Sequence, residues 1–497
     1  MILMYHKIAP EVKSIWWVSP NAFHMQMCEL EGMEVVRLDE YDPENPSHVV
    51  ITFDGVYSNV CQFALPILKR FEYPFELFIS GDSIGRTNEF DSVEPSTSFA
   101  SIEELNLMVE SGGRVQWHSK SHRRIVSAEL SKEELLEELN IPDSLKASFS
   151  SEHFKWFAYP HGQFDDETKS IVSEKFIGGI ACENGSKTDL FALPRITVKE
   201  NTKLSSTKIS CIVASYNYGR FLPDALDSVL RQTVRPDEMI IIDDGSNDET
   251  LEIAQDYAAM YPKLIKIVSN ETNQGIVKTF NKAVRISTGD FILILGADNR
   301  LLSNYIEECA RILRKKPDVG IAYTDFYLFG DRARVLFASW NPEFRGRELS
   351  QDYFEIKFPV FSESSLQLLK SGRNFIHGSS MFRREAFDEA GGYVEREGKP
   401  EDYDLFLRII DKGWRAEKAG LTGLEYRQHS KDQINLRLGM ANLASHYYRQ
   451  KKRLESENAR LLEKIDSQSF ALERRIKNIL RSAKRLLRKV LEKRGRQ

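Results

Sequence analysis

The stretch that decides the fold runs from Lys208 to Leu301 and begins KISCIVASYNYGRFLPDALDSVLRQT. It continues with MIIIDDGSNDET (239–250) and ETNQGIVKTFNKAV (271–284), and it closes with GDFILILGADNRL (289–301). Three short runs in it are rich in Ile, Val and Leu: Ile209–Val213, Met239–Ile242 and Phe291–Leu295. Each run ends in small or acidic residues, and segments of helical period separate the runs. This pattern predicts buried parallel strands in an α/β sheet.

Acidic side chains follow the predicted strands. In parallel α/β sheets, ligands bind beyond the carboxyl ends of the strands. We therefore expect Asp243, Asp244 and Asp298 to converge on one crevice with the turn Ser215-Tyr216-Asn217. Carboxylates at that place suit sugar hydroxyls, the edge of a base or a metal ion. The alternative is that these acids only end their strands.

The motifs occur in a characteristic order: SYN, DDGS followed by ET, N-x-G before a helix, an acidic turn at Asp298, GSSMFRREAF, GGY and EDYD. Together they resemble family 2 glycosyltransferases of the A-type fold, over roughly Lys208 to Asn435. The resemblance implies a Rossmann-like domain at 207–440. It also implies a nucleotide-sugar donor, expected to be UDP-linked, and an acceptor that is a surface glycan or a lipid-linked saccharide.

The same resemblance assigns residues to the donor. It implies that Tyr216 packs on the base and that Asp243 or Asp244 accepts a hydrogen bond from it. Asp298 matches the last acid of the family's D-x-D turn, which binds Mn²⁺ or Mg²⁺ at the diphosphate. The first acid is absent here, because Gly296 stands in its place. A hard cation that keeps several waters can still be held by a single protein carboxylate.

Two further residues are expected on the acceptor and metal side. Asp402 precedes the apolar-periodic YDLFLRII, so we place it near a helix N-terminus, where a carboxylate is favoured. In inverting relatives the matching Asp is the general base for the acceptor hydroxyl. Glu401 and Asp402 can also separate in pKa, and the alternative is that they only cap the helix. His429 resembles a histidine that some relatives add to the metal shell, or it is a surface histidine.

Residues 1–200 form a second predicted α/β unit. The ordered motifs TFD, H-S-x-x-H, YPHG and PRI resemble polysaccharide deacetylases, metal-dependent hydrolases with a distorted β/α barrel. His118 and His122, four residues apart after a strand, could bind Zn²⁺ or a similar ion. Asp54 matches the family's catalytic base, which deprotonates the attacking water. His6, in MYHKI, matches the general acid of one branch of the family.

This unit departs from the family pattern at two positions. The family motif is TFDDG, and its second Asp is the third metal ligand, whereas this chain has Gly55 there. Another carboxylate, such as Asp82, would have to substitute. An arginine that many relatives carry is also missing, because Ala158 stands in its place. The domain is therefore either a working deacetylase or a fold that binds sugar without cleaving it.

Composition bounds the remaining possibilities. The chain has 497 residues, 41% hydrophobic and 28% charged, which is typical of a soluble globular protein with two domains and an appendage. No apolar run reaches the length of a membrane span, and no basic and apolar signal region precedes the first predicted strand. Five cysteines without C-x-x-C spacing support neither a disulfide framework nor a zinc ribbon. We expect a cytoplasmic protein.

The last part of the chain, 441–497, is predicted to be a helical tail. Residues 454–472 show the spacing of a short coiled coil, which would allow a homodimer, or a helix packed on its own domain. Residues 474–497 then carry eleven Lys or Arg against one acid, and their apolar residues share one helical face. This favours a peripheral contact with the inner, anionic face of the cell membrane over a solvated extension. Nucleic-acid binding is not favoured, because no fold for it accompanies the charge.

Two functional hypotheses follow. The first is a bifunctional enzyme of polysaccharide biosynthesis at the cell envelope, combining sugar transfer with deacetylation. The second is a non-catalytic, membrane-associated scaffold in which Gly55 and Gly296 mark lost metal sites. The retained Asp298, Asp402 and DDGS motif favour the first hypothesis for the transferase half.

Overall fold

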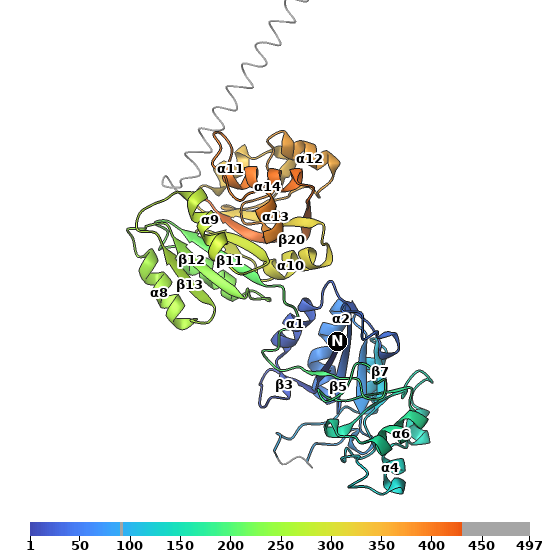
Figure 1. Cartoon of the computed structure of the whole chain (residues 1–497). Coiled ribbons are helices and arrows are strands. Elements are labelled where there is room, and N and C mark those ends of the chain that lie inside the picture. The colour runs from blue at the N-terminus through green and yellow to red at the C-terminus, as the bar shows by residue number, and fades with distance from the viewer. Residues whose placement is uncertain (90–92, 430–497) are drawn as a thin grey trace, which may run out of the picture.

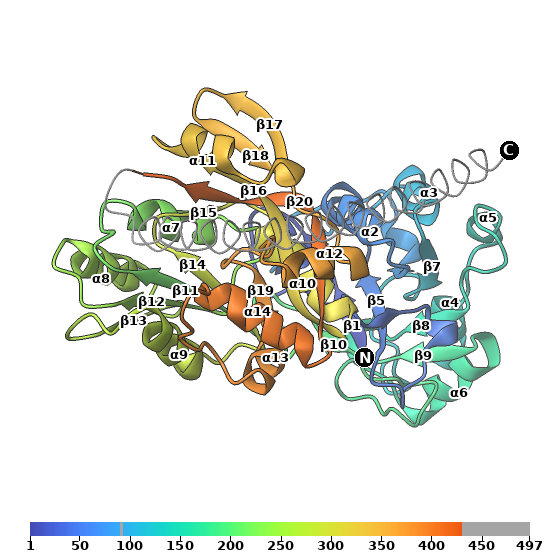
Figure 2. The same ribbon diagram turned by 90° about the horizontal axis from the view of Figure 1, so that it is seen from above.

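The computed structural model describes residues 1–89 and 93–429, which form two α/β domains (Figures 1 and 2). The predicted tail at 441–497, with its coiled coil and basic helix, lies outside the described residues. Among the described residues, no helix combines the length and the apolar character needed to cross a bilayer.

The N-terminal domain is built on a parallel sheet with strand order β10-β1-β5-β6-β7-β8-β9. Its strands are β1 (Ile2–Tyr5), β5 (His48–Asp54), β6 (Phe75–Ile79), β7 (Gly113–Trp117), β8 (Trp156–Ala158), β9 (Gly178–Ile180) and β10 (Ile196–Thr197). A short β4 (Glu34–Val35) pairs with β5, and β2 (Lys7–Ile8) pairs with β3 (Trp17–Val18). The central strands β6 and β7 are buried throughout, and Arg114 and Gln116 of β7 both donate hydrogen bonds to Glu76 of β6.

Helices connect these strands: α1 (Pro20–Glu29), α2 (Leu65–Phe71), α3 (Ile102–Val109), α4 (Lys132–Glu138), α5 (Asp143–Lys146) and α6 (Asp166–Lys175). Several begin where the sequence supplies a cap. Ser101 accepts a hydrogen bond from the backbone N–H of Glu104, and the Glu104 side chain accepts from the backbone of Ser101 in return. Such reciprocal capping satisfies two backbone groups that the helix itself leaves unpaired.

The C-terminal domain has a ten-stranded mixed sheet, with main order β13-β12-β11-β14-β19-β16-β18-β17. Its strands are β11 (Ile209–Ser215), β12 (Glu238–Asp243), β13 (Ile265–Ser269), β14 (Phe291–Gly296), β15 (Arg300–Leu301), β16 (Val319–Phe329), β17 (Arg345–Ser350), β18 (Tyr353–Ile356), β19 (Met381–Arg383) and β20 (Arg415–Arg427). Its helices are α7 (Leu222–Leu230), α8 (Thr250–Met260), α9 (Ile276–Ile286), α10 (Tyr305–Lys315), α11 (Ala333–Ser339), α12 (Glu363–Lys370), α13 (Arg384–Glu389) and α14 (Glu401–Asp411).

The three strands predicted from the Ile, Val and Leu runs are confirmed as β11, β12 and β14. Strand β11 lies between the other two and runs parallel to both. Ser215 is paired with Asp243, and Ala214 with Gly296, so the carboxyl ends of the three strands meet at one edge. The polar turns that follow the strands are therefore neighbours in space.

The two domains contact each other through α1 of the first and α10 of the second, as Figure 1 shows. Cys28 on α1 packs within the apolar core of the C-terminal domain. The backbone carbonyl of Cys28 accepts a hydrogen bond from Arg314 Nη1 at 3.2 Å. Gly32 approaches so closely that a Cβ at this position would lie 2.7 Å from the carbonyl oxygen of Arg314. The contact thus leaves no room for a side chain at residue 32.

Ion pairs complete this contact. Lys315 Nζ lies 3.3 Å from Glu31, and Lys203 bridges Glu29 and Asp237 at 3.2 and 3.1 Å. Lys203 belongs to the segment between the domains, Lys199–Thr207, so the connection itself is bound on both sides. The connection between the domains is short and polar, and it joins domains that are in contact.

His24, Cys28 and Glu307 form a cluster at the same contact, with donor atoms within 4.8 Å of one another. The Glu307 carboxylate is already engaged, because it pairs with Arg70 and accepts hydrogen bonds from Thr233 and from the His24 ring. Burial, followed by the charge of Glu307, raises the pKa of the Cys28 thiol far above its ordinary value. Because the Glu307 carboxylate already has partners from both domains, we interpret the cluster as an interdomain hydrogen-bond network.

Candidate functional sites

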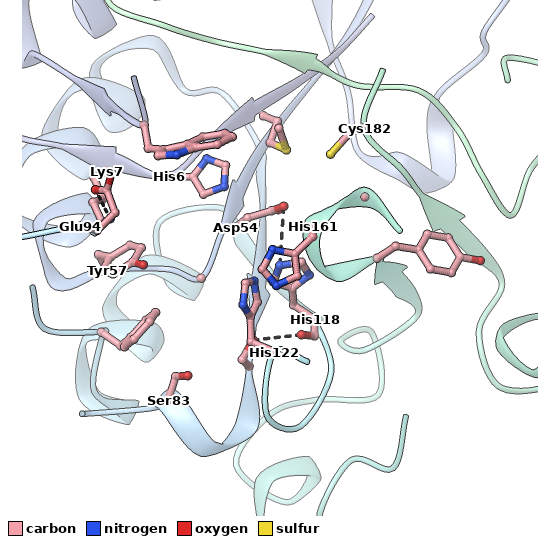
Figure 3. A pocket seen from close by; sticks show the side chains of 17 residues that line it. His6, Lys7, Asp54, Tyr57, Ser83, Glu94, His118, His122, His161 and Cys182 are labelled. Atoms are coloured by element: carbon pink, nitrogen blue, oxygen red, sulfur yellow. Dashed lines mark hydrogen bonds and ion pairs between the residues drawn. The ribbon is translucent and has the colours of Figure 1, made fainter. Parts of the chain in front are cut away.

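A cavity of about 290 Å³ opens at the carboxyl ends of the N-terminal strands (Figure 3). Four histidines and one aspartate predicted or quoted above line it: His6, Asp54, His118, His122 and His161. His6 follows β1, Asp54 ends β5, and His118 follows β7. The parallel sheet thus brings together residues that lie more than 100 positions apart in the sequence.

Asp54 is held by a buried arginine that the sequence reasoning missed. Arg195 Nη1 and Nη2 lie 2.6 and 2.7 Å from the two oxygens of Asp54, and both side chains are buried. Burial alone would raise the pKa of Asp54, but Arg195, with smaller contributions from His118 and His6, holds it well below its ordinary value. Asp54 is therefore a carboxylate at all ordinary pH values.

The arginine expected at the position of Ala158 is absent, and Arg195 reaches the cavity from another part of the chain. Arg195 belongs to the PRI motif and directly precedes β10. Strand β10 lies two strands away from β5 in the sheet, with β1 between them, and the Arg195 side chain reaches across β1 to Asp54 at the end of β5. It is fixed further by a hydrogen bond from Arg195 Nε to the carbonyl oxygen of Ala181, at 2.9 Å. The PRI motif itself was the only sequence signal for this role.

His118 has a defined tautomer. Its Nδ1 lies 2.8 Å from the carbonyl oxygen of Ala158, which can only accept a hydrogen bond, so Nδ1 carries the proton. The lone pair of neutral His118 is then on Nε2, 3.9 Å from Asp54 Oδ2. Burial lowers the pKa of His118, although Asp54 opposes this. A carbonyl that orients the far nitrogen in this way is the usual support of a metal-binding histidine.

His122 and His161 extend the row of imidazoles. The ring centroids of His118 and His122 are 4.8 Å apart, and those of His122 and His161 are 4.7 Å apart. Burial, followed by the charges of His118 and His161, lowers the pKa of His122 to about 2. The YPHG motif contains His161 but does not by itself predict a role for it. Its place at the cavity follows from the turn after β8, which no local pattern reveals.

The cavity does not receive the substitute carboxylate suggested above. Asp82 is exposed, and it is Ser83 of the same turn that lines the cavity. Gly55 has a φ of +78°, and a Cβ there would meet the Tyr57 and Phe99 rings at 3.1 and 3.3 Å. The backbone of Gly55 thus favours glycine, and an aspartate at this position would be strained.

His6 lies on the opposite side of the cavity from the imidazole row (Figure 3). Its ring centroid is 4.7 Å from that of Trp16. Burial lowers the pKa of His6 to about 4, with Asp54 opposing the shift. His6 is thus neutral at rest, and it must take up a proton before it can act as the general acid that its motif suggests.

In the C-terminal domain, the side chains of Asp243 and Asp244 are both buried and hydrogen-bonded. Asp243 accepts hydrogen bonds from the Ser246 hydroxyl and backbone, and Ser269 Oγ lies 3.2 Å away. Asp244 accepts from Asn270 Nδ2 at 2.7 Å and from the backbone N–H groups of Gln274 and Gly275. Asp244 thereby fixes the N-x-G turn before α9. The role of either carboxylate toward a base stays a prediction.

A second cavity, of about 470 Å³, lies at the SYN turn. Its lining includes the predicted residues Tyr216 and His429, together with Arg220, Asp248 and Glu249. Asn217 has a left-handed φ of +55°, and its side chain accepts a hydrogen bond from the backbone of Asn247 at 2.8 Å. The turn after β11 is therefore locked to the turn after β12, and one wall of the cavity is rigid.

Asp298 and His429 are brought together from distant parts of the sequence. His429 Nε2 lies 3.4 Å from Asp298 Oδ2, and both side chains are buried. Neither ring nitrogen of His429 has a hydrogen-bond partner among the described residues. Buried polar atoms normally have partners. A divalent cation held by Asp298 and His429 would give His429 Nε2 a partner, so the two side chains fit the metal that the resemblance implies.

An acid at residue 296 would require small shifts of the neighbouring side chains. A Cβ at residue 296 would lie 3.0 Å from Asp298 Oδ1 and 3.1 Å from Asn299 Nδ2. Asn299 in turn accepts a hydrogen bond from the backbone of Arg427 at 2.9 Å, and Arg427 Nε donates to the carbonyl of Asp298. These hydrogen bonds tie the Asp298 turn to β20 beside residue 296.

Asp402 lies in the first turn of α14, as the sequence predicted. Burial, followed by the charge of Glu401, raises the pKa of Asp402 to about 7. Its carboxylate rests against Gly378, where a Cβ would lie 2.8 Å from Asp402 Oδ2. Gly378 opens the GSS segment, so this glycine makes room for the acid. A carboxylate with a pKa near 7 is well matched to accept a proton from a hydroxyl group.

Comparison with known proteins also divides the chain into these two domains. The profile described as "Glycosyl transferase family 2" matches residues 210–391, and "Polysaccharide deacetylase" matches residues 41–176. The chain is 32% identical over 217 residues to "Putative glycosyltransferase EpsE" of Bacillus subtilis, covering 42% of this chain and 69% of that protein. It is 28% identical to "Chondroitin synthase" of Escherichia coli, covering 41% of this chain and 27% of that one.

A solved deacetylase structure is similar to part of this chain. The Streptococcus pyogenes deacetylase PplD, in complex with acetate, is 21% identical and aligns with a TM-score of 0.35, covering 40% of this chain and 92% of that one. The two profile matches, at 41–176 and 210–391, fall on different halves of the chain. The chain belongs to glycosyltransferase family 2, and it carries a polysaccharide deacetylase domain fused in front of the transferase.

Proposed function

We propose that the C-terminal domain moves a sugar from a UDP-linked donor to a surface-glycan or lipid-linked acceptor, with inversion at the anomeric carbon. The observation that carries this proposal is the buried pair Asp298 and His429 beside the cavity at Tyr216. A divalent cation, Mn²⁺ or Mg²⁺, held by that pair would neutralise charge on the leaving diphosphate.

The chain's own residues would divide the work as follows. Tyr216, half-buried in the wall of the cavity, would pack on the base of the donor. Asp402 would take the proton of the acceptor hydroxyl as its oxygen forms a bond to the anomeric carbon. The bond from that carbon to the diphosphate breaks, and the nucleoside diphosphate leaves with the electron pair. The raised pKa of Asp402 supports its role as base.

The test of sugar transfer is the release of UDP from a panel of UDP-sugars, with and without Mn²⁺. We expect one UDP-sugar to give metal-dependent release that an added glycan acceptor increases. If no UDP-sugar is consumed with or without metal, while the folded protein is intact by circular dichroism, the UDP-linked donor is rejected.

A second activity is supported by the N-terminal cavity. We propose that this domain removes N-acetyl groups from amino sugars, with Asp54 as base for the attacking water and His6 as the group that protonates the leaving amine. Asp54, held ionised by Arg195, and His6 line the same cavity. Acetate release from an N-acetylhexosamine glycan tests this activity. Its absence would leave the domain as a sugar-binding fold.

Replacing Asp298 by Ala is expected to weaken Mn²⁺-dependent UDP binding about tenfold or more, because the cation loses its carboxylate ligand. His429→Ala should weaken it in the same direction. Asp256→Ala is the matched control, since Asp256 is an exposed acid on α8. Isothermal titration with UDP in Mn²⁺ and in a chelator measures the effect. Equal UDP affinity of Asp298→Ala and the natural protein in Mn²⁺ would reject Asp298 as ligand.

A peripheral membrane role of the tail rests on sequence alone, because the tail lies outside the described residues. A chain that ends at Ser469 removes the eleven basic residues of 474–497. We expect it to keep UDP release and to lose binding to anionic vesicles, since each Lys or Arg near such a surface contributes about 1 kcal/mol. Vesicle sedimentation at low and high salt measures this, and equal binding by both chains would point to the catalytic domains.

A further inference from the structure

We propose that His161 is the third ligand of a divalent metal site formed with His118 and His122, in place of the carboxylate that residue 55 lacks. Only the use of this site, and not its existence, depends on the proposed deacetylase function. The existence of the site rests on the cavity itself, in which the three imidazoles stand side by side (Figure 3).

The other acidic groups of the cavity are already engaged. Among the described residues that line it, the carboxylates are Asp54 and Glu94. Both oxygens of Asp54 bind Arg195. Glu94 binds Lys7 Nζ and Trp17 Nε1, each at 2.9 Å. Among the described residues, the groups left to supply a third protein ligand beside His118 and His122 are therefore neutral ones.

The backbone aims His161 at this place. Its turn, Pro160–Gly162, gives His161 a left-handed φ of +57°, which is unfavourable for a residue with a side chain. Gly162 follows with a φ of +67°, and a Cβ there would lie 2.6 Å from Cys182 Sγ. The carbonyl of Gly162 also accepts a hydrogen bond from Asn184 Nδ2 at 2.9 Å. The surrounding contacts thus hold a costly conformation that turns the His161 ring toward His122.

The donor set suits a particular class of ion. Three imidazole nitrogens with an open fourth position are a known ligand set of zinc enzymes, and imidazole also suits Co²⁺, Ni²⁺ and Cu²⁺ more than Mg²⁺. The Asp54 carboxylate, 3.9 Å from His118 Nε2, supplies negative charge near the ion. His122 stands between the other two rings, so binding should draw His118 and His161 toward one another.

The test compares metal binding of the natural protein with that of His161→Asn, His118→Ala and His48→Ala. Asparagine tolerates the left-handed backbone of residue 161 but lacks the imidazole. His48 lies at the start of β5 and serves as a histidine control. All chains also carry Asp298→Ala and His429→Ala, so that the second candidate cation site does not contribute. After chelator treatment, each is titrated with Co²⁺ and Zn²⁺.

We expect the natural cavity to bind Co²⁺ with a visible absorption band, and His161→Asn to bind at least tenfold more weakly, as His118→Ala does. His48→Ala should bind as the natural cavity does. His161→Cys should restore binding and add a sulfur-to-cobalt band in the near ultraviolet. Unchanged affinity and spectrum in His161→Asn would overturn the proposal, and so would the absence of binding by the natural cavity.

Acetate release separates this inference from the proposed activity. If the three histidines bind metal but no acetate appears, the metal site stands and the deacetylase activity fails. If acetate appears and His161→Asn loses neither acetate release nor metal, the activity stands and His161 is not a ligand. Circular dichroism of each variant shows that the domain is folded.

Discussion

Replacing Asp402 by Asn is expected to lower the kcat of sugar transfer by a factor of about 10² to 10⁴, the contribution of a well-placed general base. The amide keeps the shape of the group beside Gly378 but cannot accept the proton of the acceptor hydroxyl. UDP affinity should not change, because Asp402 lies in the first turn of α14, apart from the residues that line the cavity at Tyr216. Transfer rates and UDP titration together measure both effects.

The pH dependence gives this prediction a sharper form. Since the pKa of Asp402 is raised to about 7, its base form grows as pH rises through 7, and kcat/KM should rise with it. Glu401→Gln is the matched control, because it removes the negative charge that, after burial, contributes to raising this pKa. It should keep activity and shift the rise to lower pH. A pH profile of Glu401→Gln identical to the natural one would contradict the coupling.

Asp402→Asn, which should lower the rate of transfer, should raise the stability of the fold. An Asp whose pKa is raised on folding keeps its proton in the folded state between about pH 4 and pH 7, while the unfolded chain has lost it. Stability from this group therefore falls as pH rises through that window and stays low above it. Asp402→Asn, which carries no charge, is expected to raise Tm at pH 8 while it removes transfer. This combination separates loss of a base from loss of the fold.

Replacing Arg195 by Met is expected to destabilise the N-terminal domain by about 3–5 kcal/mol, since it leaves Asp54 buried without its partner. In the natural protein the depressed pKa of Asp54 contributes stability that is present above its unfolded pKa and is lost only in strong acid. In Arg195→Met, burial raises the pKa instead, so stability should fall as pH rises above about 4. Urea unfolding at several pH values measures both.

The double variant Asp54→Asn, Arg195→Met is the control for this prediction. It removes the buried charge together with its partner, and it should be more stable than Arg195→Met alone at pH 7. If the double variant is as unstable as the single one, the cost comes from lost packing of the arginine side chain. The ion pair of Asp54 and Arg195 would then contribute less to the stability of the domain than its geometry suggests.

The sequence revealed what depends on local pattern. The runs that became β11, β12 and β14 are apolar and β-branched, and their polar turns follow directly, so both the strands and the edge could be predicted. Asp402 was placed in the first turn of a helix because the apolar period begins just after it. These features are decided by residues close to each other in the chain.

What the sequence did not reveal depends on pairing between distant segments. Arg195 reaches Asp54 only because β10 joins the sheet beside β1, after more than 100 intervening residues. His161 reaches the other histidines only because its turn adopts a left-handed conformation that the letters YPHG do not specify. The substitute carboxylate suggested at Asp82 failed for the same reason, since its turn presents Ser83 to the cavity.

The contact between α1 and α10 has a consequence for how such a chain can change over evolution. Cys28 completes the apolar core of the neighbouring domain, Glu307 binds groups from both domains, and Gly32 leaves space for the Arg314 carbonyl. A recombination event that brought in another deacetylase-like domain would have to bring these matching residues with it. Otherwise the apolar surface around Cys28 would be exposed, and Glu307 would lose its partners from the first domain. We therefore expect new sugar specificities to arise by point substitution within the cavities more readily than by exchange of domains.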